Sequence, residues 1–137
     1  MALAIPMFCV SCKKSDTTTP TTTTPTPTTP KIDGTWTVKE YDGAAVASPM
    51  AATIKFTAST STTGTGTVHF DITFDGSTHQ TEDDTYTLSS SDTKLDFIKT
   101  GGGYNVLNGG NTWTVDTLNS NTLRMTSKYN LVIKATK

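Results

Sequence analysis

Apolar and polar side chains alternate with a period of two residues between positions 68 and 74. Val68, Phe70, Ile72 and Phe74 are separated by polar residues at 69, 71 and 73. This period places every second side chain on one face of a strand, whereas a helix needs apolar residues three and four positions apart. The segment is therefore predicted to be a β-strand with one buried face.

The same alternation recurs in seven further runs, and none shows helical spacing over the ten or more residues that a helix requires. The residues that carry it are Trp36 and Val38, Ile54 and Phe56, Tyr86 and Leu88, Leu95 and Phe97, Trp113 and Val115, Leu123 and Met125, and Leu131, Ile133 and Ala135. We therefore predict an all-β domain of eight strands.

The connections between these runs favour antiparallel neighbours. Those at 59–65, 75–83, 89–92 and 119–121 are short and rich in turn-forming residues. They are too short for the crossover that parallel strands need. Eight such strands must close into a barrel or split into two sheets. We predict an eight-stranded antiparallel meander barrel, because closure removes exposed edges; a β-sandwich is the alternative.

Charge and cysteine content exclude several functions for this domain. The formal net charge is −1 and Arg124 is the single arginine, so no basic face for nucleic acid is expected. Both cysteines, Cys9 and Cys12, precede residue 17. The domain therefore has no disulfide, no zinc–thiolate site and no cysteine nucleophile. We expect neither a metal nor a cofactor.

A stalk precedes the domain. Residues 17–30 contain only Thr and Pro. Proline fixes extended geometry and the segment has nothing apolar to bury, so a semi-rigid spacer is predicted. The single folded domain is then expected over residues 31–137.

The N-terminal residues resemble an export and anchoring signal. Residues 2–10 form an apolar run too short to span a bilayer, and Ser11, Cys12 and the basic pair Lys13 and Lys14 follow it. This order resembles the lipobox of bacterial lipoproteins. The resemblance implies that residues 1–11 are a signal-peptide remnant, that Cys12 carries the lipid, and that residues 12–30 are its linker. The implied partner is the membrane, and the implied location is the outer membrane, at its periplasmic face or the cell surface.

The first strand carries a second resemblance. Gly34-Thr35-Trp36 resembles the Gly-x-Trp motif of the lipocalins, and the later strands resemble lipocalin-like domains of Gram-negative lipoproteins. The resemblance implies that Trp36 plugs one barrel end with an arginine across it. Arg124 lies in a late strand, although the alternation places its side chain on the other face of that strand from Leu123 and Met125. The implied apolar interior would be lined by Phe56, Phe70, Phe74, Phe97 and Met125.

Two longer connections could contact a ligand at the barrel mouth. Residues 41–51 are unusually apolar for a loop and include Val46 and Met50; they either contact a ligand as a lid or pack over the barrel end. Residues 100–111 hold five glycines around Tyr104. Tyr104 is accordingly a candidate ligand contact on a flap, with an ordinary hairpin loop as the alternative.

The remaining polar residues do not form a recognisable catalytic site. Glu82, Asp83 and Asp84 are predicted to form a solvated turn, because their spacing matches no calcium loop. His69 and His79 do not make a zinc ligand set, and His69 is expected to point outward. No nucleophile, base and orienting partner can be identified, so an enzyme is not expected.

Two functions remain open for a monomeric domain of this kind. One is a non-enzymatic, lipid-anchored barrel that binds a small hydrophobic ligand. The other is a structural or interaction module with a filled core that contacts an envelope protein or a glycan. Interior volume discriminates between them, because ligand pockets are typically about 300 Å³ or larger.

Overall fold

The computed structural model describes residues 32–60, 64–89, 91–102 and 111–137, and these residues form nine strands and no helix. The strands are β1 (Gly34–Tyr41), β2 (Ala44–Ala45), β3 (Ala51–Ala58), β4 (Thr65–Thr73), β5 (His79–Leu88), β6 (Lys94–Gly102), β7 (Thr112–Leu118), β8 (Thr122–Ser127) and β9 (Val132–Thr136). Within the described ranges, no helix is long and apolar enough to cross a membrane.

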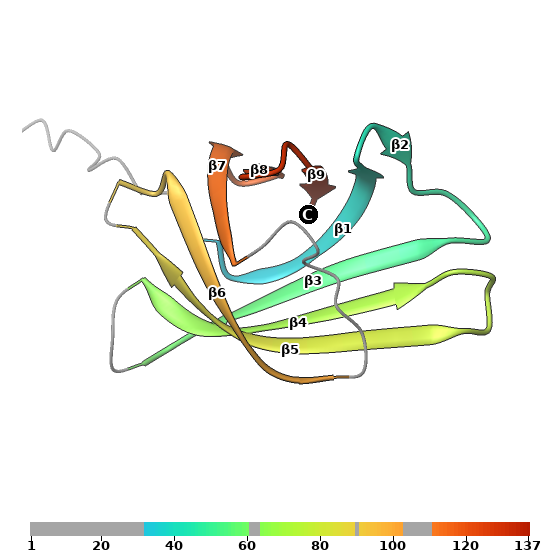
Figure 1. Ribbon diagram of the computed structural model, residues 1–137, viewed down its shortest axis with the longest axis horizontal. Coiled ribbons are helices and arrows are strands. Elements are labelled where there is room, and N and C mark those ends of the chain that lie inside the picture. Colours follow the sequence, from blue (N-terminus) through green and yellow to red (C-terminus); the bar gives the residue numbers. More distant parts are fainter. Residues whose placement is uncertain (1–31, 61–63, 90, 103–110) are drawn as a thin grey trace, which may run out of the picture.

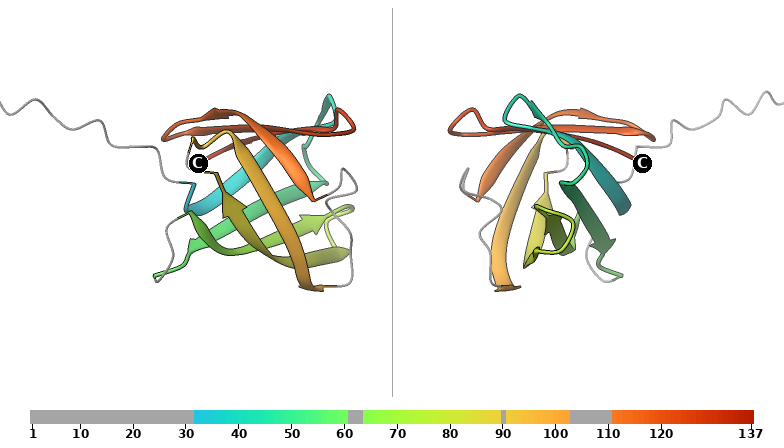
Figure 2. Two further views of the ribbon diagram at one scale, coloured as in Figure 1. Left: turned by 60° about the vertical axis from the view of Figure 1, so that its left-hand side comes forward. Right: turned by 90° about the vertical axis from the view of Figure 1, so that its right-hand side faces the viewer.

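The strands form one antiparallel sheet that closes on itself. From β3 to β9 each strand pairs with the next along the chain, β1 pairs with β3, and β9 returns to pair with β1 (Figures 1 and 2). Eight strands make the barrel, and the two-residue β2 is an additional strand paired with the end of β1. The predicted eight-stranded antiparallel meander barrel is confirmed.

Three irregularities in register bend the barrel wall. They lie between Val38 and Glu40 on β1, between Asp83 and Asp84 on β5, and between Val115 and Thr117 on β7. An extra residue on one strand increases the local twist, which helps a sheet to curl into a barrel. In the second irregularity the extra residue is Thr100 on β6, so Asp84 pairs with Lys99.

The inward-facing side chains fill the middle of the barrel. Trp36, Leu95, Trp113, Leu123, Met125 and Ala135 are fully buried. Phe56 packs edge-on against Tyr86 at 5.2 Å between ring centroids, and Phe70 packs against Phe97 at 5.9 Å. Such contacts add to the stabilisation that burial of apolar area provides.

Gly66 allows three strands to pack closely near one end of the barrel. It pairs with Ala58 on β3 and with Tyr86 on β5. A Cβ at this position would lie 2.1 Å from the Thr57 carbonyl oxygen and 2.7 Å from Tyr86 Cε1. A glycine is therefore required for the Tyr86 ring to lie against the backbone of β4.

Candidate functional site

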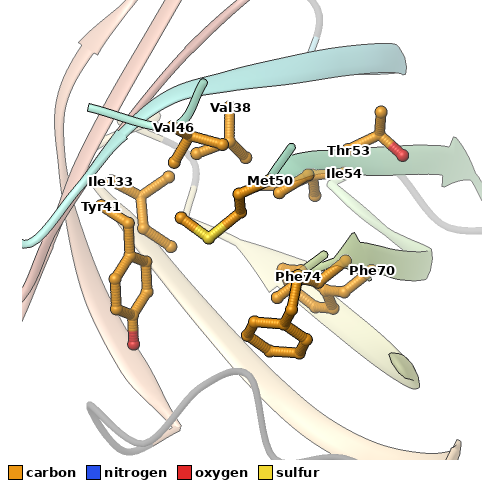
Figure 3. Close-up of a pocket in the computed structure, with 11 residues that line it drawn as sticks. Val38, Tyr41, Val46, Met50, Thr53, Ile54, Phe70, Phe74 and Ile133 are labelled. Atoms are coloured by element: carbon orange, nitrogen blue, oxygen red, sulfur yellow. The ribbon is translucent and has the colours of Figure 1, made fainter. Parts of the chain in front are cut away.

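An apolar pocket opens at the end of the barrel where β1 ends and β3 begins. We call it the mouth pocket, and its eleven lining residues are Val38, Tyr41, Val46, Met50, Ala52, Thr53, Ile54, Phe70, Ile72, Phe74 and Ile133 (Figure 3). Its volume is about 90 Å³. The lining has no charged side chain, so the pocket suits an apolar group.

Period-two alternation on three strands explains most of this lining. Val38 on β1, Ile54 on β3 and Phe70 on β4 are the inward-facing members of their strands and are buried. Further toward the mouth, Ile72 continues the same face of β4, and Phe74 follows just after the strand. Phe74 is 39% exposed, which places it at the rim.

The connection between β1 and β3 completes the pocket. Val46 and Met50 both line it, and the Val46 N–H donates to the Lys39 carbonyl at 2.9 Å. Figure 3 shows the Met50 side chain extending into the space between Val38, Ile133 and Phe74. The apolar residues of this connection therefore pack over the mouth, and Met50 occupies space that a ligand would use.

The predicted ligand contacts divide into two groups. Phe70 and Phe74 line the mouth pocket. Phe56, Phe97 and Met125 are at most 2% exposed and belong to the packed core instead. Tyr104 lies outside the described residues, as does the proposed acylation site Cys12.

The opposite end of the barrel is closed by Trp36. Its ring is fully buried and its Nε1–H donates to the Ile32 carbonyl oxygen at 2.6 Å. The cation over this ring is Lys137, whose Nζ is 4.4 Å from the ring centroid and donates to the Asp33 carbonyl at 2.5 Å. A Cβ on Gly34 would approach the same lysine, at 3.3 Å from its Cε.

The expected pairing of Arg124 with Trp36 is corrected by this arrangement. Arg124 alternates with the buried Leu123 and Met125, so its side chain leaves the barrel. Outside, its Nη1 donates to Asp116 Oδ2 at 2.8 Å. The parity of β8 thus excludes Arg124 from the plug, and Lys137 takes the position across Trp36.

The acidic residues at 82–84 do not form the predicted solvated turn. They lie within β5, and the turn before this strand is organised by Asp75, whose Oδ1 accepts from the Thr78 N–H at 2.6 Å. Glu82 and Asp84 face the barrel interior and are 1% and 2% exposed, whereas Asp83 points outward. The correction follows from strand parity, because Tyr86 on the same strand also faces inward.

Burial has a direct consequence for the acidity of Asp84. Desolvation, with a further contribution from the negative charge of Glu82, raises the pKa of Asp84 to about 6, although Lys99 opposes the shift. Within the described residues Asp84 Oδ1 has no hydrogen-bond partner. A buried carboxylate oxygen without a partner is energetically costly and therefore unusual.

Tyr86 is the next inward-facing residue of β5 after Glu82 and Asp84. Its hydroxyl donates to Asp33 Oδ1 at 3.2 Å, while its ring remains in the core. Burial, followed by the nearby negative charge of Asp33, raises the pKa of Tyr86 to about 12. Tyr86 therefore stays protonated at neutral pH and acts as a donor.

The two histidines lie outside the barrel, as the alternation predicts for His69. His69 Nδ1 is 2.6 Å from Asp83 Oδ1, and His79 Nδ1 is 3.1 Å from Asp71 Oδ1. Among the residues with described positions, no group of three or more His, Cys, Asp or Glu side chains is placed to hold a metal ion.

A second, more open depression of about 480 Å³ lies near the ends of β3, β4 and β5. Seven of its nine lining residues carry a hydroxyl group; the lining is formed by Thr57, Ala58, Ser59, Thr65, Gly66, Thr67, Thr85, Tyr86 and Thr87. It is larger and more open than the mouth pocket, and its lining mixes polar and apolar atoms.

No family model matches the chain, and neither a curated protein nor a solved structure matches it.

Proposed function

We propose that this chain is a non-enzymatic, lipid-anchored envelope protein of a Gram-negative bacterium whose lipocalin-like barrel binds a small hydrophobic group. The observation that carries the proposal is the mouth pocket, which has apolar walls from β1, β3, β4 and β9 and a methionine extending into it. Apolar concave sites of this kind gain free energy when an apolar group replaces water.

The size of the pocket limits the ligand. A volume of about 90 Å³ is well below the roughly 300 Å³ of a typical small-molecule site. The pocket therefore accommodates a narrow group, such as a short alkyl chain or the end of an acyl chain. Met50 is unbranched and flexible, so its displacement would lengthen the available space.

The anchor is the second part of the proposal. A cysteine that carries two or more acyl chains binds membranes stably, because each buried methylene contributes about 0.8 kcal/mol. Replacing Cys12 with serine should therefore move the protein from the membrane fraction to the soluble fraction. Continued membrane association of the Cys12→Ser protein would contradict lipid anchoring.

Native mass spectrometry of the full chain, gently extracted from cells, tests ligand binding. We expect a one-to-one adduct with a small lipophile. The Met50→Trp variant should lose the adduct because the larger ring fills the pocket, while Ile98→Trp should retain it because Ile98 is 66% exposed. An adduct that persists unchanged in Met50→Trp would contradict the mouth pocket as the site.

A structural or interaction module is the second candidate, and two observations favour it. The middle of the barrel is packed with large side chains, and the larger depression is lined by hydroxyl groups that suit a glycan or a polar protein surface. Absence of any adduct on the wild-type chain would favour this candidate over the lipophile binder.

A further inference from the structure

Met50 contributes the single sulfur atom among the eleven residues that line the mouth pocket. Figure 3 shows its thioether in the space between the walls of the pocket. The side chain is only partly buried, so small solutes can reach the sulfur from the mouth. Accessible methionines are common targets of oxidation to the sulfoxide. Met50 therefore combines a reactive atom with a position that a ligand would need.

The backbone that carries Met50 is fixed on both sides of this residue. The Met50 N–H donates to the Ala47 carbonyl at 2.9 Å, and Ala51 begins β3, where it pairs with β4. Earlier in the same connection, Val46 packs against the buried core and donates to the Lys39 carbonyl at 2.9 Å. The Met50 side chain has three rotatable bonds. It can therefore leave the pocket by rotation while the connection stays in place.

The lining offers an oxidised methionine little to bond with. Nine of the eleven lining side chains are hydrocarbon or thioether, and the two hydroxyl groups belong to Tyr41 and Thr53. Figure 3 shows both hydroxyl groups directed away from the Met50 thioether. A polar atom that is placed among apolar groups without a partner loses its hydration. The oxygen of a sulfoxide at Met50 would therefore be better solvated outside the pocket.

We propose that Met50 is a redox-controlled gate of the mouth pocket: oxidation of its thioether by a peroxide turns the side chain outward and opens the pocket to an apolar ligand. Hydrogen peroxide transfers one oxygen atom to the sulfur. Its O–O bond breaks, an S–O bond forms, the sulfur loses two electrons and the peroxide is reduced to water. Methionine sulfoxide reductases reverse the modification. This inference rests on the pocket binding proposed above and adds its regulation.

The modification site is tested by treating the full chain with dilute hydrogen peroxide and measuring each methionine-containing peptide by mass spectrometry. Met125 is the internal control, because it is fully buried in the packed middle of the barrel. We expect Met50 to gain one oxygen atom while Met125 remains unmodified. Oxidation of Met125 as fast as that of Met50 would overturn the proposal, because the sulfur of Met50 would then have no preferential access to peroxide.

The effect on the pocket is measured by titrating 1-butanol into the reduced and the oxidised chain and following NMR chemical shifts. Oxidation should tighten binding about threefold or more, because the ligand no longer has to displace an apolar side chain. Met50→Leu cannot form a sulfoxide, so its affinity should be the same before and after peroxide. This variant also reports any effect of peroxide elsewhere in the chain. Met50→Ala should match the oxidised wild type without peroxide.

The outcomes separate the gate from the pocket. Binding of butanol that is unchanged or weakened by oxidation of Met50 overturns the gate and supports the pocket. A gain that is equally large in Met50→Leu also overturns the gate, because the effect then arises at another residue. If butanol binds neither form of the wild type nor Met50→Ala, both proposals are overturned.

Discussion

Asp84 shows how strand parity can override the polarity of a side chain. Its neighbours Val68, on β4, and Tyr86, two residues along β5, are buried, so the backbone of β5 carries Asp84 inward with them. The cost of burying the carboxylate appears as a raised pKa, which favours the neutral acid. A residue retained at such a cost is a candidate for function, as buried polar groups with perturbed pKa values often are.

The raised pKa of Asp84 predicts a specific pH dependence of stability. The pKa rises from 3.8 to about 6 on folding, so the folded state holds this proton more tightly than the unfolded state. This contribution is fully present below pH 4 and is lost as the pH rises through 6. Each pKa unit corresponds to about 1.4 kcal/mol.

The Asp84→Asn variant isolates this effect, because it keeps the shape of the side chain and removes the charge. Between pH 4 and pH 8 wild type should lose about 1–3 kcal/mol of stability that the variant keeps. The free energy of unfolding of the variant minus that of wild type should therefore increase by this amount. Urea titrations at the two pH values measure this difference. A difference between the two proteins that does not change with pH would contradict the burial of an ionisable Asp84.

The sequence contained a signal for this site that hydropathy alone does not reveal. Counting back in steps of two from Tyr86 places Asp84 and Glu82 on the inner face. Three adjacent acidic residues are typical of an exposed turn, but here the alternation of side chains along the strand determines where they lie. Similarly, the sequence identifies Phe56, Phe70 and Phe97 as inward-facing, but it cannot tell which of them line empty space, because that depends on how side chains from different strands interlock.

At the scale of elements, period-two alternation predicted the eight barrel strands and the antiparallel turns between them. The register could not be predicted in the same way. The pairing of β9 with β1 brings Lys137, rather than Arg124, over the Trp36 ring. The register of that pairing includes a bulge, which has no clear signature in the sequence. Local pattern therefore predicts a strand and its faces, whereas long-range pairing decides which residues meet.

The plugged end of the barrel gives a prediction for two cations. Lys137→Met removes both the contact with the Trp36 ring and the hydrogen bond to the Asp33 carbonyl, and should destabilise the fold by about 1–2 kcal/mol. Arg124→Met removes a half-exposed ion pair with Asp116 and should cost less than about 1 kcal/mol. Thermal unfolding of both variants measures the contrast. If Arg124→Met were more destabilising than Lys137→Met, the contact of Lys137 with the Trp36 ring would not be the stabilising one.

The contact between β3, β4 and β5 gives a prediction for two glycines. Gly66→Ala should destabilise the barrel by about 3 kcal/mol or more, because the new methyl group would overlap the Thr57 carbonyl and the Tyr86 ring. Gly101→Ala is the control, since a Cβ there meets only Asp83 atoms at 3.6 Å. Equal unfolding midpoints for the two variants in denaturant would contradict the close packing at Gly66.

The whole molecule combines a plugged end, a packed middle and an apolar mouth. Closure of β1 with β9 is reinforced across the seam by Lys134 Nζ, which donates to Glu40 Oε2 at 2.6 Å. Closure satisfies the backbone groups at both edges of the sheet, so the barrel does not depend on disulfides or metals for integrity. The apolar pocket lies at the mouth, between β1, β3, β4 and β9.

The most direct test of this account is an NMR measurement of intermolecular NOEs between 1-butanol and the labelled methyl groups of the methionines. Met50 extends into the mouth pocket, whereas Met125 is fully buried in the packed middle. We predict NOEs from the butyl chain to the Met50 methyl and none to the Met125 methyl. NOEs to Met125 without any to Met50 would show that the ligand space is in the barrel interior and would contradict a filled barrel with a binding mouth.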